Sequence, residues 1–266
     1  MCRWAAWSGA PVFLETIVTR PAHSLIAQSR AATECKAGTN GDGFGIAWYG
    51  EPEAPGLFRD VRPAWSDPNI EHLCRMIRSR MFLAHVRAAT GTATSVENCH
   101  PFTQGRWSFM HNGQVGGMDA FRKNVDMAIP EALYHARRGT TDSEALFLIA
   151  CGFGLDADPV GAVARATRYL ENLSREAGAA PHMRLTACWS DGARLFAARH
   201  ASDDYAPSLY FRRCDDGYLV VSEPLDDLAD DWLPVAPGDC LIVENGQHRF
   251  VPFLCPATKK GRANAA

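Results

Sequence analysis

Cys2 has the most direct route to covalent chemistry in this sequence, because it directly follows the initiator Met1. Cysteine is small enough for Met1 to be trimmed, which would leave Cys2 with a free α-amino group. The α-amine has an ordinary pKa of ~7.7–8.0, so part of it is an unprotonated base at neutral pH. Held beside its own thiol, it can take the thiol proton and later return it to a leaving group. Position alone does not establish this role, since a chance cysteine in a first strand is the commoner explanation.

Two apolar segments of strand length end in polar residues that could bind a substrate. The first ends in His85 and Arg87 and opens into a loop of small residues. The planar guanidinium of Arg87 is suited to hold a carboxylate through two parallel hydrogen bonds. The second runs into Asn112 and Gly113. A side-chain N–H of Asn112 and the unobstructed backbone N–H of Gly113 could form an oxyanion hole, typically worth ~2.7–4 kcal/mol per donor.

Three further clusters are ambiguous when each is taken alone. Residues 98–102 (Asn-Cys-His-Pro-Phe) form a polar turn, and its Cys99 could pair with a distant histidine as in papain-like enzymes. Residues 140–144 (Thr-Thr-Asp-Ser-Glu) precede an apolar helix, which is typical of an N-cap with acid in the first turn. Residues 40–45 lack the Gly-Lys-Ser/Thr ending of a phosphate cradle, so they predict a tight turn.

The elements that must position these residues are strands, hairpins and a few helices. Short apolar runs predict strands over 45–49, 81–86 and 107–111, and helical spacing predicts an amphipathic helix over 160–177. Hairpins are predicted for three pairs of segments, which are 184–189 with 194–199, 209–213 with 218–222, and 240–244 with 248–252. Antiparallel hairpins among a few helices favour an α+β sandwich over an alternating βαβ fold.

Composition excludes several classes of protein. The chain has 266 residues, of which 47% are hydrophobic and 21% charged, as in an ordinary globular protein. A net charge of −3 argues against nucleic acid or anionic lipid as the main partner. No apolar run approaches the ~18–20 residues that cross a bilayer. Nine cysteines without a CxxC pair predict reduced thiols in a cytoplasmic protein. The candidate ligands His85, His100, His111, Cys99 and Asp42 show no metal-binding spacing, so we expect neither metal nor cofactor.

Taken together and in this order, the clusters resemble the class II glutamine amidotransferases, whose glutaminase domain is an N-terminal-nucleophile hydrolase. The matching segments are Met1-Cys2 and residues 40–45, 85–90, 98–102, 111–113 and 141–144. They lie within roughly the first 150 residues, and the hairpin-rich remainder is compatible with the rest of such a domain.

The resemblance implies an α+β fold, the αββα four-layer sandwich of two mainly antiparallel sheets. It implies that Cys2 is the nucleophile and that Asn112 and Gly113 form the oxyanion hole. Arg87 would hold the α-carboxylate of the substrate and Asp142 its α-ammonium, so that each charged end meets the opposite sign. The remaining implied site residues are Thr90 and His100, which bind substrate, and Asn40, Gly41 and Asp42, which wall the pocket.

The implied function is hydrolysis of the side-chain amide of glutamine, or of a γ-glutamyl amide or peptide, through a glutamyl thioester. Met-Cys-Arg at the start and residues 20–29 and 98–102 look closer to a stand-alone branch. That branch includes the glutathione-degrading amidotransferase-like subunit and the ergothioneine-pathway γ-glutamyl amidohydrolase. Residues 88–89 (Ala-Ala) depart from the biosynthetic enzymes, which tend to have an aromatic residue there. The alternative is a catalytically silent subunit that binds glutamine or a γ-glutamyl group.

We expect one glutamine amidotransferase type-2 domain over residues 1–256 and a disordered tail over 257–266. The motifs and the sandwich that carries them use nearly all of the chain, which leaves no second domain to consume released ammonia. We therefore expect a small-molecule substrate and a possible partner protein or homodimer, with neither nucleic acid nor membrane as a partner.

Overall fold

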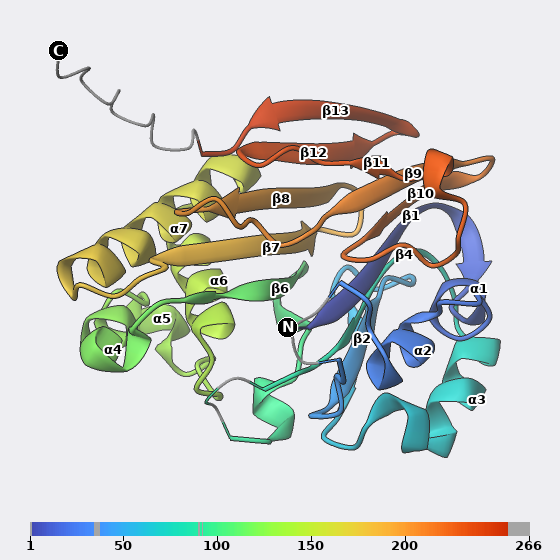
Figure 1. Ribbon diagram of the computed structural model, residues 1–266, viewed down its shortest axis with the longest axis horizontal. Coiled ribbons are helices and arrows are strands. Elements are labelled where there is room, and N and C mark those ends of the chain that lie inside the picture. Colours follow the sequence, from blue (N-terminus) through green and yellow to red (C-terminus); the bar gives the residue numbers. More distant parts are fainter. Residues whose placement is uncertain (1, 35–37, 90, 92, 255–266) are drawn as a thin grey trace, which may run out of the picture.

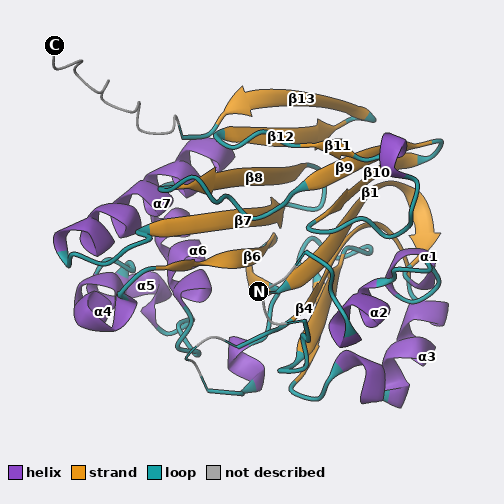
Figure 2. Cartoon of the chain, in the orientation of Figure 1, coloured by secondary structure: helices purple, strands orange, loops and turns teal. Residues whose placement is uncertain are grey.

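Two antiparallel β-sheets pack face to face, and helices cover the outer face of each, in a computed structural model that describes residues 2–34, 38–89, 91 and 93–254 (Figures 1 and 2). These four layers confirm the predicted αββα architecture. The first sheet has the strand order β11-β9-β10-β1-β4-β2-β3, and the second has the order β13-β12-β8-β7-β6-β5.

The first sheet consists of β1 (Arg3–Phe13), β2 (Phe44–Trp48), β3 (Gly56–Asp60), β4 (Arg78–Val86), β9 (Tyr210–Cys214), β10 (Gly217–Val221) and β11 (Leu233–Pro234). The second consists of β5 (Phe102–Gln104), β6 (Trp107–Val115), β7 (Met183–Ser190), β8 (Leu195–Ala201), β12 (Asp239–Glu244) and β13 (Gln247–Pro252). The predicted strands and the three predicted hairpins are all present, with bounds that shift by a few residues.

The helices fall into two groups in the sequence and in space. Those on the first sheet are α1 (Glu15–Val18), α2 (Leu25–Arg30) and α3 (Pro68–Met76), and those on the second are α4 (Met118–Met127), α5 (Glu131–Tyr134), α6 (Asp142–Gly152) and α7 (Pro159–Glu176). Short 3₁₀ helices cover Ala64–Ser66, Val96–Asn98 and Ala229–Asp231. The helix predicted over 160–177 is α7, which begins one residue earlier because Asp158 caps it and Pro159 suits its first turn.

Side-chain alternation along the strands produces three hydrophobic cores. In β1, Trp4 and Ala6 face the space between the sheets, whereas Ala5 and Trp7 face the helices α1 to α3. A third core lies between the second sheet and α4 to α7, and α6 is buried there over most of its length. Cys2, two residues before Trp4, continues the row that faces the other sheet.

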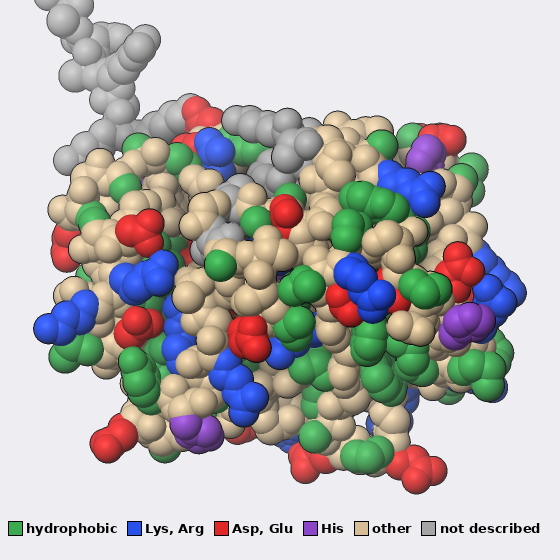
Figure 3. Space-filling view, turned by 90° about the horizontal axis from the view of Figure 1, so that it is seen from below, with side chains coloured by type: hydrophobic (Ala, Val, Ile, Leu, Met, Phe, Trp, Pro, Cys, Tyr) green, Lys and Arg blue, Asp and Glu red, His purple; other side chains and the backbone are tan. Residues whose placement is uncertain are grey.

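No helix in the described part of the chain combines the length and the apolar character that a membrane span requires. The face of the molecule shown in Figure 3 carries acidic and basic side chains in a mixed pattern.

Candidate active site

A cavity of about 790 Å³ lies where the ends of β1, β4 and β6 meet the start of α6. Five of the predicted site residues line it, although they come from distant parts of the sequence. They are Cys2, Arg87, His100, Gly113 and Asp142. The cavity extends along residues 113–120 and Arg122, beyond the predicted glutamyl-binding residues.

Cys2 is half-buried and its backbone is held by a buried ion pair. The Sγ atom of Cys2 lies 3.7 Å from the carbonyl oxygen of Ala88. The carbonyl oxygen of Cys2 accepts a hydrogen bond from Nη1 of Arg3 at 3.1 Å. Arg3 is fully buried, and its Nε donates to Oε2 of Glu223 at 2.6 Å. The guanidinium that contacts Cys2 is thus fixed by a carboxylate from the other end of the chain.

Burial raises the pKa of the Cys2 thiol, while its contact with Ala88 and the charges of Arg87 and Arg3 act in the opposite direction. The thiol is therefore protonated at neutral pH and needs a base before it can act as a nucleophile.

The side-chain amide of Asn112 is unpaired among the described residues, and Asn112 itself does not line the cavity although its neighbour Gly113 does. Asn112 is fully buried, and neither its Oδ1 nor its Nδ2 has a hydrogen-bond partner among the described residues. Its carbonyl oxygen accepts from Oγ1 of Thr186 at 3.2 Å, which fixes the backbone. Buried polar groups are normally paired, so an amide with two free atoms indicates a place for ligand or water atoms.

Gly113 must be glycine at this position. Its φ is +153°, and an added Cβ would collide with the carbonyl oxygen of Arg184 and lie 2.6 Å from Nε2 of His111. Since no side chain covers it, the backbone of Gly113 is open to the cavity.

Arg87 is held in the cavity wall by backbone carbonyl groups. Its Nη1 donates to the oxygen of Asp42 at 3.2 Å and its Nη2 to the oxygen of Ala93 at 3.2 Å. The backbone N–H of Arg87 donates to Gly43, and Arg87 in turn accepts from the N–H of Asp42. The Asp42 carboxylate accepts from the N–H of Ala89 at 2.7 Å.

The predicted pocket-wall residues Asn40, Gly41 and Asp42 do not line the cavity themselves. They form a layer behind Arg87 and Ala89, because the turn pairs with the backbone that leaves β4. Asn40 is buried and bonds to the carbonyl oxygen of Gln28, away from the cavity.

The Asp142 carboxylate faces the cavity from the first turn of α6. Its Oδ2 accepts from the N–H of Val115 at 2.8 Å, and its Oδ1 accepts from Oγ of Ser143 at 3.0 Å. The N-cap of α6 is Thr141, as predicted, and its Oγ1 accepts from the N–H of Glu144. Thr141 therefore caps α6 in place of Asp142, and the hydrogen bond from Val115 of β6 orients the Asp142 carboxylate.

Three histidines around the cavity are neutral. His85 and His100 stack with ring centroids 4.2 Å apart, and none of their ring nitrogens has a hydrogen bond of acceptable geometry with a described residue. Burial lowers the pKa of His85 to about 3 and holds the pKa of His100 well below its ordinary value. Burial also lowers the pKa of His111, against the attraction of Asp142. The three imidazoles therefore add no positive charge to that of Arg87 in the cavity wall.

The described residues contain no group of three His, Cys, Asp or Glu side chains placed to hold a metal ion. Thr90, predicted to bind substrate, lies outside the described residues. Sequence reasoning missed Glu223, whose surroundings carry no recognisable motif, and it assigned no role to Asn98 or Arg3. The opening Met-Cys-Arg was the one signal that could have drawn attention to Arg3.

Comparisons with known proteins agree with this geometry. The sequence profile of the class II glutamine amidotransferases matches residues 18–214. The chain is 31% identical to the probable glutamine amidotransferase DUG3 of Saccharomyces cerevisiae, over 96% of this chain and 85% of that protein. It is also 31% identical to the γ-glutamyl-hercynylcysteine sulfoxide hydrolase of Mycolicibacterium smegmatis, over 85% of this chain and 89% of that protein.

Solved structures give the same assignment. A glutamine aminotransferase class-II domain protein from Silicibacter pomeroyi is 44% identical and superposes with a TM-score of 0.76, covering 95% of this chain and 100% of that chain. The glutamine phosphoribosylpyrophosphate amidotransferase of B. subtilis is 14% identical and shares the fold, with a TM-score of 0.66 over 96% of this chain and 50% of that one. The chain therefore belongs to the class II glutamine amidotransferases, a family of amide-hydrolysing enzymes, and has their N-terminal-nucleophile hydrolase fold.

Proposed function

We propose that this protein cleaves the side-chain amide of a γ-glutamyl compound, with Cys2 as the nucleophile. The observation that carries this proposal is the convergence on one cavity of a thiol, an arginine and a carboxylate, beside an amide with two unpaired buried atoms. Each of these groups matches one part of a γ-glutamyl amide.

Removal of Met1 during maturation, before any turnover, gives Cys2 a free α-amine. The amine takes the proton of the thiol, and Sγ attacks the amide carbonyl carbon. Collapse of the tetrahedral intermediate breaks the C–N bond, and the amine proton passes to the leaving nitrogen. Water then attacks the glutamyl thioester, the C–S bond breaks, glutamate leaves and the thiol regains a proton. The raised pKa of the Cys2 thiol is the reason that this sequence needs a base at the nucleophile itself.

Asn112 Nδ2 and the backbone N–H of Gly113 stabilise the oxyanion of both tetrahedral intermediates. The unpaired amide of Asn112 and the lack of a side chain on Gly113 support this role. Because these donors are fixed before substrate arrives, they need little reorganisation in the transition state.

Arg87 binds the α-carboxylate and Asp142 binds the α-ammonium, with Thr90 and His100 as further substrate contacts. The opposite charges of Arg87 and Asp142 at one cavity support this orientation. The γ-amide would then project toward Cys2, and the leaving group toward the part of the cavity lined by residues 113–120.

A γ-glutamyl peptide or amide fits this arrangement better than glutamine alone. The cavity of about 790 Å³ continues past the glutamyl-binding residues, and sites for small molecules commonly measure ~300–1,000 Å³. One of the similar proteins is named for hydrolysis of a γ-glutamyl cysteine derivative. If glutamine is the substrate instead, we expect a partner protein that receives the released ammonia.

The test is an assay of glutamine, glutathione and a series of γ-glutamyl amides, on protein whose mass shows that Met1 has been removed. We expect a γ-glutamyl peptide or amide to give the highest kcat/KM. A glutamine-like diazo-ketone should modify Cys2 and no other cysteine. Labelling at Cys99, or full activity in protein that retains Met1, would contradict the N-terminal mechanism.

A further inference from the structure

We propose that Asn98 is a positioning residue that holds Arg87 and Asp142 at the separation that a γ-glutamyl group requires. This inference rests on the proposed roles of those two residues. Asn98 does not line the cavity, and its side chain joins the segment that bonds to Arg87 to the segment that leads into Asp142.

The Asn98 side chain is buried and uses both halves of its amide. Only 1% of the residue is exposed. Its Nδ2 donates to the carbonyl oxygen of Ala93 at 2.8 Å and to Oγ1 of Thr140 at 3.2 Å. Its Oδ1 accepts from the backbone N–H of Thr140 at 2.7 Å. One planar amide thus connects two loops that are separated by more than forty residues.

On the Arg87 side, the link passes through a single carbonyl group. The oxygen of Ala93 accepts from Nη2 of Arg87 at 3.2 Å as well as from Nδ2 of Asn98. A carbonyl oxygen has two lone pairs, so it can accept both bonds at once. If Asn98 no longer fixed Ala93, the guanidinium would lose one of the carbonyl groups that orient its fork.

On the Asp142 side, the segment of residues 138–140 is held between Asn98 and Glu144. The Glu144 carboxylate accepts from the backbone N–H groups of Arg138 at 3.1 Å and Gly139 at 2.8 Å. A Cβ on Gly139 would lie 2.5 Å from Oδ1 of Asn98 and 3.1 Å from Oε2 of Glu144, so nothing larger than glycine fits. Thr141 and Asp142 follow directly, which makes the start of α6 depend on this contact.

The two halves of the amide make the inference testable with two variants. Asn98→Asp keeps the acceptor for the backbone N–H of Thr140 and can accept from the Thr140 hydroxyl, but it loses the donor to Ala93. Asn98→Ala loses all of these contacts. Asn98→Asp should therefore weaken recognition of the α-carboxylate alone, and Asn98→Ala should weaken recognition of both charged groups. An error in placement of about 1 Å can cost on the order of 100-fold in rate, so effects on KM of about 10- to 100-fold are expected.

The experiment compares three probes that differ only in the charged groups. They are glutamine, 4-aminobutanamide, which lacks the α-carboxylate, and glutaramate, which lacks the α-ammonium. Asn98→Asp should lower kcat/KM for glutamine and glutaramate, mainly through KM, and leave kcat/KM for 4-aminobutanamide within about threefold of the wild type. Asn98→Ala should lower kcat/KM for all three probes. Added to Arg87→Lys, Asn98→Asp should cause little further loss on glutamine, because both act on one contact.

The single variants Arg87→Lys and Asp142→Asn test the proposed orientation of the glutamyl group separately from the positioning role of Asn98. If neither shows the expected charge selectivity, the proposed glutamyl orientation fails. If both show it and Asn98→Asp lowers kcat/KM equally for the three probes, or lowers kcat alone, Asn98 has no positioning role. Asn69→Asp on α3 is the matched control, because it makes the same exchange at an exposed residue outside the cavity lining. Thermal unfolding of each variant, followed by circular dichroism, shows whether a loss reflects unfolding.

Discussion

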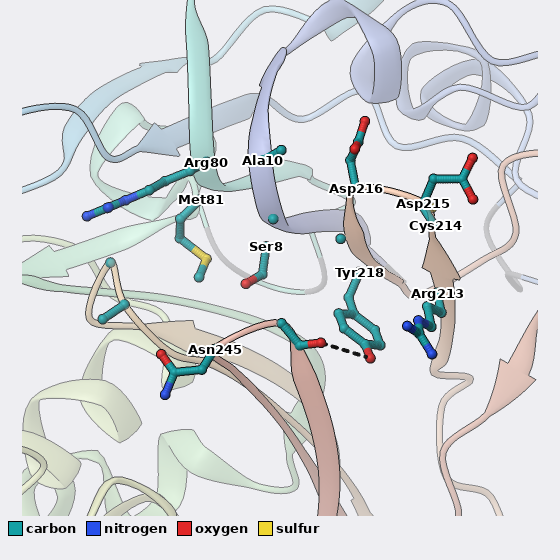
Figure 4. Close-up of a pocket in the computed structure, with 15 residues that line it drawn as sticks. Ser8, Ala10, Arg80, Met81, Arg213, Cys214, Asp215, Asp216, Tyr218 and Asn245 are labelled. Carbon is teal, nitrogen blue, oxygen red and sulfur yellow. Dashed lines mark hydrogen bonds between the residues drawn. The ribbon is translucent and has the colours of Figure 1, made fainter.

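Two cavities at different ends of β1 contain similar residue types and differ in how those residues are held. The first contains Cys2, Arg87 and Asp142. The second, of about 470 Å³, lies at the hairpin turns and is lined by Arg213, Cys214 and other polar residues (Figure 4). Both cavities thus offer a thiol, a guanidinium and a carboxylate.

The polar side chains of the second cavity do not converge. Asp215, Asp216 and Arg80 are exposed and point in different directions (Figure 4). Its marked hydrogen bond joins the hydroxyl of Tyr218 to the carbonyl oxygen of Gly246, at 3.5 Å, which holds two hairpins together. Beside the first cavity, by contrast, Asn112 is buried next to the lining residue Gly113, and both of its polar side-chain atoms are unpaired among the described residues.

The difference shows that residue type is weak evidence for a site. Exposed charged groups on turns are already solvated and gain little from a ligand. A buried polar group without a partner has lost its water, so a ligand that pairs with it gains the full interaction. Variants matched between the two cavities test this distinction.

The largest effect is expected at the two cysteines. Cys2→Ala should abolish turnover, because it removes the nucleophile, and should leave the fold intact. Cys214→Ala in the second cavity should leave kcat/KM unchanged. The measurement is steady-state hydrolysis of the best γ-glutamyl substrate, with circular dichroism as the check on folding. Residual turnover in Cys2→Ala above the level of a mock purification would contradict the comparison.

The next largest effect is expected at Asn112. Asn112→Ala should lower kcat by about 10²–10³-fold with a smaller change in KM, because the lost donor acts on charge that develops in the transition state. Asn245→Ala is the counterpart in the second cavity and should not change kcat. If Asn112→Ala raised KM and left kcat unchanged, the Asn112 amide would bind the substrate in its ground state and would not stabilise the transition state.

Arg87→Lys keeps the positive charge and loses the bidentate fork, so we expect KM to rise about tenfold or more with a lesser effect on kcat. Asp142→Asn should act in the same way through the ammonium group. Arg213→Lys, at an exposed position of the second cavity, should leave both constants unchanged. Normal substrate affinity in both Arg87→Lys and Asp142→Asn would remove the proposed orientation of the substrate.

A stability effect is expected at Glu223. Glu223→Gln removes the counter-charge of the fully buried Arg3 and should lower the free energy of unfolding by about 3 kcal/mol, since breaking a buried pair leaves a charge uncompensated. Asp216→Asn removes an exposed carboxylate of the second cavity and should change it by less than about 0.5 kcal/mol. Urea unfolding measures both. Equal stability of the two variants would show that the Arg3–Glu223 pair contributes nothing.

Much of the fold could be predicted from local patterns, and the contacts between distant segments could not. Alternating apolar residues and turns such as Asn245-Gly246 predict hairpins because the strands involved are adjacent in sequence. The contact of Glu223 with Arg3 spans 220 residues and follows from the pairing of β1 with β10, which brings Ser222 against Trp4. No short motif encodes such a register.

The candidate site shows the same division. The ordered motifs predicted Cys2, Arg87 and Asp142 as site residues, because a family resemblance carries residue roles directly, and the three residues line one cavity. The resemblance did not predict that the turn at Asn40 to Asp42 lies behind Arg87, because this placement depends on how the loop after β4 folds back on the turn. The role of Asn98 likewise depends on two loops that meet only in three dimensions.

The smallest of the expected stability effects comes from pH, at His85, which lines neither cavity but stacks on His100 of the first. Burial lowers the pKa of His85 to about 3, against about 6.5 in an unfolded chain. As pH falls below about 6.5, His85 becomes protonated in the unfolded chain but stays neutral in the folded chain. This difference stabilises the fold above pH 6.5, and the stabilisation is lost as pH falls toward 3. One such histidine contributes a slope of about 1.4 kcal/mol per pH unit. His85→Gln should reduce the pH dependence of the free energy of unfolding between pH 6.5 and 5 by about that amount. Urea unfolding at a series of pH values measures the slope, and an unchanged slope in His85→Gln would mean that this imidazole is protonated within the fold.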